Sequence, residues 1–168
     1  AGQTSATLTI TGTDDAIDES DETIILTPSA SGAVLASNAA LNIAFTDNDL
    51  PPVVSSITAT TADGAYKEGQ AIAITVTFDK AVTVTGTPQL TLETGSSDAV
   101  VDYASGTGTT TLTFNYTIAS GQNSDDLDYV ATSSLALNSG TITETGGTSD
   151  VTLTLPAPGA TNSLGANK

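Results

Sequence analysis

The sequence predicts an all-β fold of antiparallel sandwiches, and three observations support this prediction. Apolar residues alternate with Thr and Ser at a period of two, which places successive side chains on opposite faces of a strand. Clusters of Gly, Asn, Asp and Ser separate these alternating segments at short intervals, as in a β-sandwich. No segment carries the 3.6-residue apolar period that would predict a helix with confidence.

The alternating segments define the expected strands. Their apolar residues are Leu8 and Ile10; Leu41, Ile43 and Phe45; Ile72, Ile74, Val76 and Phe78; Leu90 and Leu92; Leu112, Phe114, Tyr116 and Ile118; and Val151, Leu153 and Leu155. In the second half we expect strands near 53–60, 71–78, 87–93, 99–104, 110–118 and 127–131. The Ala-rich stretch 29–40 is expected to be a loop.

A domain boundary is predicted at the acidic and proline-rich stretch 47–52. Pro51 and Pro52 cannot sit in a central strand, and they stiffen a short connection. We therefore expect two units, 1–49 and 50–168. The second is long enough for a complete sandwich. The first holds three or four strands, too few to close a sandwich, so we expect it not to fold autonomously and to be an incomplete module.

Composition excludes several classes of function. The chain has 19 acidic residues, three Lys and no Arg, for a net charge of −16. Nucleic acid and anionic membranes are therefore unexpected partners, because both need clustered cationic side chains. Without Cys or His, the chain cannot form a disulfide or a zinc site of the usual kind. No apolar run approaches the ~20 residues of a membrane span, so no membrane insertion is expected.

An acidic stretch in the first unit is the strongest candidate site. Residues 14–22 read DDAIDESDE, with six carboxylates in nine positions, and Asp47 and Asp49 follow a predicted strand. Crowded carboxylates repel one another unless a counter-ion relieves the repulsion. Ca²⁺ takes six to eight hard oxygen ligands in flexible loops. The sequence therefore predicts a calcium site where these two segments reach one end of a sheet.

The first unit resembles the C-terminal half of a Calx-beta domain over residues 5–49. The resemblance lies in a strand, the acidic stretch, the strand 23–26, the strand 39–45 and the closing Asp-Asn-Asp. It implies a calcium site at the tip where the next domain begins. The matching ligand positions are Asp14, Asp15, Glu19, Glu22, Asp47 and Asp49. Asp18 and Asp21 do not match ligand positions.

The second unit resembles an immunoglobulin-like repeat of giant bacterial adhesins and other surface proteins. The resemblance is carried by TADGAYKEG at 61–69, VTVTGTPQL at 82–90, DDLDY at 125–129 and LPAPG at 155–159. It implies immunoglobulin-like sandwiches in tandem, an extracellular or cell-surface location, and neighbouring modules or subunits as partners. We expect a calcium-stabilised spacer in which calcium rigidifies the module junction.

A second, weaker calcium site is expected at the far end of this unit. If the strands alternate in direction, the loops 61–70, 94–98 and 119–126 lie together, with one further carboxylate just inside the next strand. The candidate ligands are Asp63, Glu68, Asp98, Asp125, Asp126 and Asp128.

Three other functions are compatible with parts of the sequence. An enzyme would have to use a carboxylate pair, which needs one acid in an apolar pocket, and the acids here lie in polar turns. An ice-binding surface could use the Thr-x-Thr pairs, but these have no fixed period. A self-assembling filament or sheath could form by strand addition at open sheet edges, and it is the principal alternative.

Overall fold

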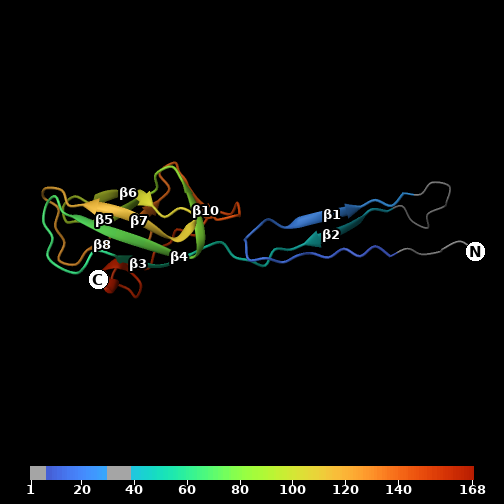
Figure 1. The fold of residues 1–168 in the computed structure, drawn as a ribbon, viewed down its shortest axis with the longest axis horizontal. Helices are drawn as coiled ribbons and strands as arrows, with labels where there is room; N and C mark the ends of the chain where they lie inside the picture. The colour runs from blue at the N-terminus through green and yellow to red at the C-terminus, as the bar shows by residue number, and fades with distance from the viewer. Residues whose placement is uncertain (1–6, 30–38) are drawn as a thin grey trace, which may run out of the picture. The chain divides into compact units, whose positions relative to one another are not determined.

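The chain is all-β, as the sequence predicts. In the computed structural model, which describes residues 7–29 and 39–168, nearly all regular structure is antiparallel strand, and the described helix has four residues. The chain divides into two compact units, Ala1–Asp49 and Leu50–Lys168. We describe each unit by itself (Figure 1).

The first unit contains one antiparallel pair of strands. Strand β1 (Glu22–Leu26) pairs with β2 (Leu41–Phe45), and Ile24 lies opposite Ile43. This register puts the apolar alternate residues of both strands on one face. None of the described residues of this unit is buried, and Leu41 is 58% exposed. Two strands offer too little surface to enclose a core.

Two predictions for this unit have different outcomes. The strand expected at Leu8 and Ile10 is wrong, because these residues have no regular structure. Alternation alone cannot form a strand without a hydrogen-bonding neighbour, and β1 and β2 pair with each other. Of the loop expected over 29–40, the part 30–38 lies outside the described residues.

The second unit is built on a long central strand. The hydrogen-bonded path is β10–β4–β7–β6–β5–β8, with β3 on β4 and β9 on β5 (Figure 1). The strands are β3 (Val54–Ala59), β4 (Ala71–Thr85), β5 (Gln89–Glu93), β6 (Ala99–Ser105), β7 (Thr109–Thr117), β8 (Asp128–Tyr129), β9 (Leu135–Ala136) and β10 (Thr141–Glu144). A short helix, α1 (Leu164–Asn167), lies near the C-terminus.

The core follows the alternation seen in the sequence. On the paired strands β4 and β7, Ile74 lies opposite Phe114 and Val76 opposite Leu112, and all four are buried. Leu90 on β5 belongs to the same core, although β5 does not pair with β4. Strands from distant parts of the path therefore enclose one apolar interior.

The segment 151–155 corrects a second strand prediction. Val151 and Leu155 are buried, as the alternation requires, but the segment makes isolated contacts and no continuous ladder. The backbone N–H of Thr152 bonds to the carbonyl of Pro52, and that of Leu155 to the carbonyl of Thr132. Because its partners change along its length, the segment packs into the core without becoming a strand.

Tyr129 on β8 is a buried polar anchor in this core. Its side chain is 1% exposed, and its hydroxyl donates to the carbonyl oxygen of Pro156 at 2.7 Å. Burial, with a smaller contribution from the charge of Asp128, raises the pKa of Tyr129 to about 12. The neutral phenol is therefore strongly preferred in the folded state.

This pKa predicts a loss of stability in alkali. Below pH ~10, tyrosine is neutral in both states, so Tyr129 adds no pH dependence. Between pH 10 and 12 the unfolded state loses its proton first, and the free energy of unfolding falls by up to roughly 3 kcal/mol. Urea unfolding from pH 8 to 11.5 measures this fall. In the variant Tyr129→Phe the free energy of unfolding should decline less steeply with pH. An unchanged decline would contradict the attribution of this pH dependence to Tyr129.

Candidate functional site

The pairing of β1 with β2 brings the two acidic segments of the first unit together. Glu22 opens β1 and lies opposite Phe45, which closes β2. The stretch 14–21 leads into β1, and 46–49 leads out of β2. Because antiparallel strands run in opposite directions, both segments lie at the same end of the pair.

Backbone-to-carboxylate hydrogen bonds tie these segments to each other. The N–H of Glu19 donates to Asp47 Oδ2 at 2.7 Å, and the N–H of Asp47 donates to Asp21 Oδ1 at 3.0 Å. Asp47 Oδ1 also accepts from the N–H of Asp49 at 3.2 Å. Within the first segment, Asp15 Oδ1 accepts from the N–H of Ile17 at 2.9 Å. Asp47 is thus the residue through which the two segments are joined.

These hydrogen bonds keep the Asp47 carboxylate ionised. The bond from the backbone N–H of Glu19 is the largest cause, followed by that from Asp49, and together they lower the pKa of Asp47 below its usual value. A donated N–H stabilises the charged form of a carboxylate. Asp47 therefore keeps its negative charge to lower pH than an ordinary aspartate.

All six carboxylates of the first predicted site line one hollow of about 630 Å³. They are Asp14, Asp15, Glu19, Glu22, Asp47 and Asp49. Asp18 and Asp21 belong to the same stretch but do not line the hollow. Gly12 and Phe45 also line this hollow, and they lie so close together that a Cβ added to Gly12 would be 2.9 Å from Cε1 of Phe45.

The side chains in this hollow are gathered but not grouped as metal ligands. Among residues 7–29 and 39–168, no three carboxylates are arranged so that they could hold a metal ion. Calcium needs six to eight oxygens at 2.3–2.6 Å. Ligation would therefore require side-chain rotation toward a common centre, which exposed loop carboxylates can undergo.

The second predicted site is divided by the structure. Asp63, Asp125 and Asp126 line a hollow of about 560 Å³ in the second unit, whereas Glu68, Asp98 and Asp128 do not. Asp128 Oδ2 accepts from the N–H of Gly159 at 2.8 Å, and both it and Asp126 Oδ2 lie beside Gly165.

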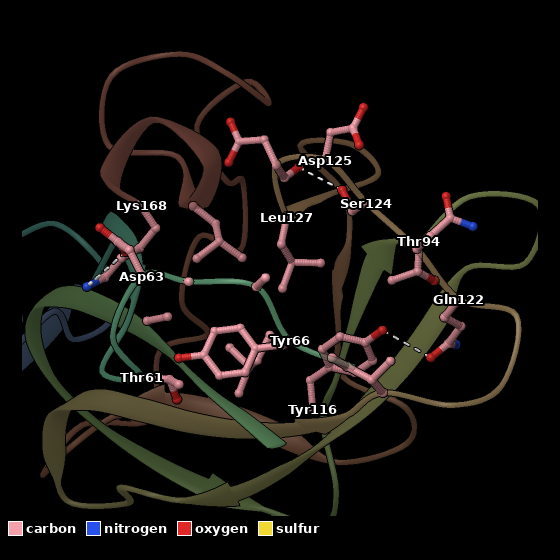
Figure 2. A pocket seen from close by; sticks show the side chains of 18 of the residues that line it. Thr61, Asp63, Tyr66, Thr94, Tyr116, Gln122, Ser124, Asp125, Leu127 and Lys168 are labelled. Atoms are coloured by element: carbon pink, nitrogen blue, oxygen red, sulfur yellow. Dashed lines mark hydrogen bonds and ion pairs between the residues drawn. The ribbon is translucent and has the colours of Figure 1, made fainter. Parts of the chain in front are cut away.

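The other groups of this hollow were not predicted from the sequence. Tyr66 and Tyr116 lie beneath Leu127, and Lys168 lies beside Asp63 (Figure 2). The nitrogen Nζ of Lys168 is 3.8 Å from Oδ1 of Asp63. Lys168 and Tyr66 lie outside the strands, where no periodicity marks their direction, so only the folded chain reveals them.

Comparisons with known proteins give no relative for this chain. No protein-family description matches it, and neither a curated protein nor a solved structure does. Across the described ranges, no helix has the length and apolar character required to cross a membrane.

Proposed function

We propose that this chain is a calcium-stabilised structural segment of a bacterial extracellular adhesin or surface protein. In this proposal the first unit is a partial Calx-beta-like sandwich, and the second is an immunoglobulin-like sandwich module. Calcium bound by the first unit rigidifies the junction between the two. The partners are neighbouring modules of the same protein, and the carboxylates have no catalytic role.

The observation that supports this proposal best is the shared hollow of the six carboxylates. Segments about 30 residues apart in the sequence supply its acids, and hydrogen bonds from Glu19 and Asp49 hold Asp47 at their meeting point. Like charges held this close favour a bound cation. Hard carboxylate oxygens in exposed loops suit calcium better than magnesium, which requires a stricter octahedral geometry.

The role at the junction follows from what comes next in the chain. Asp49 is the last residue of the first unit, and the segment after it is attached to the second unit. The N–H of Val53 donates to Asp79 Oδ1 at 2.8 Å, and the carbonyl of Pro52 accepts from Thr152. An ion held by Asp47 and Asp49 would therefore act only a few residues from a fixed point of the second unit.

Small-angle scattering of the full chain tests this mechanical role. The variant Asp47→Asn with Asp49→Asn removes two charges but keeps an amide oxygen as acceptor at each position. We expect scattering from wild type to indicate a narrower range of intraparticle distances, and so a more rigid chain, in Ca²⁺ than in EDTA. The variant should show a broad range of intraparticle distances in both conditions.

A matched control comes from the second unit. Asp98→Asn with Asp150→Asn removes the same charge from exposed residues that do not line the hollow, and it should behave as wild type. Equal rigidity of wild type in Ca²⁺ and EDTA would remove calcium from the junction.

A second candidate, a self-assembling filament subunit, is favoured by the exposed strands β1 and β2. Ile25 is 63% exposed and Leu41 58%, and each strand of this described pair has one edge that the other does not cover. Such edges can accept a strand from another chain. Sedimentation velocity separates the two proposals, because strand addition gives oligomers that grow with protein concentration.

A further inference from the structure

A hollow in the second unit combines an apolar floor with fixed aromatic rings. Its volume of about 560 Å³ lies within the range of small-molecule sites. Tyr116 is 4% exposed, and its hydroxyl donates to Oε1 of Gln122 at 3.0 Å. The hydroxyl of Tyr66 donates to the carbonyl of Ala62. Leu127 points toward both rings from the opposite side (Figure 2).

The rim of the same hollow is acidic. Asp125 and Asp126 lie on the segment between β7 and β8, where Ser124 Oγ donates to the carbonyl of Asp126 at 2.8 Å. Figure 2 shows Asp125 directed away from the rings, while Leu127 points down to them. No Lys of the described chain forms a salt bridge with Asp125 or Asp126. The rim therefore carries negative charge that the described residues leave uncompensated.

One ammonium already lies at this rim. Lys168 Nζ approaches Asp63 at 3.8 Å, where the Asp63 side chain is 75% exposed. So long and exposed a contact contributes little to stability. It places one ammonium beside a carboxylate of the rim.

We propose that this hollow binds a primary alkylammonium, such as a lysine side chain. The alkyl stem would pack against Tyr66, Tyr116 and Leu127, while the ammonium would remain at the rim beside Asp125 and Asp126. The net charge of −16 raises the local concentration of cations and disfavours anionic ligands.

The same features disfavour a metal ion in this hollow. Its lining contributes three carboxylates, from Asp63, Asp125 and Asp126, and among the described residues no three carboxylates are grouped so that they could hold a metal ion. The apolar floor would give a bare ion no partner. The proposal concerns a site in the second unit and is independent of the calcium proposed for the first.

Titration with hexylammonium, followed by tyrosine fluorescence and by NMR shifts of Tyr116 and Leu127, tests this inference. All titrations are run in EDTA, so their result does not depend on calcium. We expect saturable binding of hexylammonium, at least threefold weaker binding of 1-hexanol, and no saturable binding of hexanoate. Nα-acetyl-lysine methylamide distinguishes the two possible origins of the ligand. If it binds more tightly than hexylammonium, the ligand is a lysine of a polypeptide, and if it binds more weakly, the ligand is a free amine.

A pair of charge-matched variants locates the binding. Asp125→Asn with Asp126→Asn should weaken hexylammonium about three- to tenfold. Asp98→Asn with Asp150→Asn removes the same charge from exposed residues that do not line the hollow, and it should leave affinity within twofold. Equal weakening in both variants, or equal binding of hexanol and hexylammonium, would overturn the proposal.

Discussion

Calcium at 100 times its dissociation constant is expected to slow hydrogen exchange of the β1 and β2 amides about 100-fold relative to EDTA. This factor corresponds to about 2.7 kcal/mol of added stability. The effect should be confined to the first unit, because the hollow that gathers the six carboxylates is formed entirely within residues 10–49. Two exposed strands with no buried residue among those described have little other stabilisation.

Two comparisons make this experiment specific. Asp47→Asn with Asp49→Asn should abolish most of the calcium-dependent protection, whereas the charge-matched control Asp98→Asn with Asp150→Asn should retain it. The difference between Ca²⁺ and EDTA is the quantity to compare, because Asp47 also accepts structural hydrogen bonds from Glu19 and Asp49 without any ion. Magnesium should protect poorly. Identical exchange in Ca²⁺ and EDTA would contradict the calcium proposal.

Replacing Lys80 by Met is expected to destabilise the second unit by about 2–4 kcal/mol. Lys80 Nζ lies 3.2 Å from Glu144 Oε1, and the Glu144 side chain is only 4% exposed. The Lys80 side chain is 27% exposed, so the pair is partly buried, and removing Lys80 takes the cation away from a carboxylate that lies in the interior. Lys80 lies where β4 shifts register between Thr77 and Val82, so the pair links this irregularity to β10.

A double-mutant cycle measured by urea unfolding tests this pair. Lys80→Met with Glu144→Leu should recover most of the stability lost in Lys80→Met, because apolar residues of similar volume can replace a buried ion pair. The control Lys67→Met changes the same charge at an exposed position and should cost less than about 0.5 kcal/mol. Additive losses in the double variant would show that the two side chains do not act as a pair.

The sequence by itself determined the all-β class and which side of most strands faces the core. In Ile72–Phe78 and Leu112–Ile118 the period of two is long, and it correctly predicts β4 and β7 with Ile74 and Phe114 buried. The same rule failed as a strand prediction at Leu8 and Val151. Alternation records which side of a segment is apolar, whereas a strand also needs a neighbour, which only the tertiary structure supplies.

The sites divide in the same way. Local sequence was sufficient to identify residues 14–22 as an acidic loop, because its carboxylates are adjacent in the chain. Only the folded chain reveals the hydrogen bond from the N–H of Glu19 to Asp47. Only the folded chain also shows that Tyr66, Lys168 and Asp126 line one hollow in the second unit. Strand alternation predicted that 14–22 and 47–49 would meet, and that the loops 61–70 and 119–126 would lie together. The individual contacts within these meetings depend on loop paths and register, which leave no periodic signal in the chain.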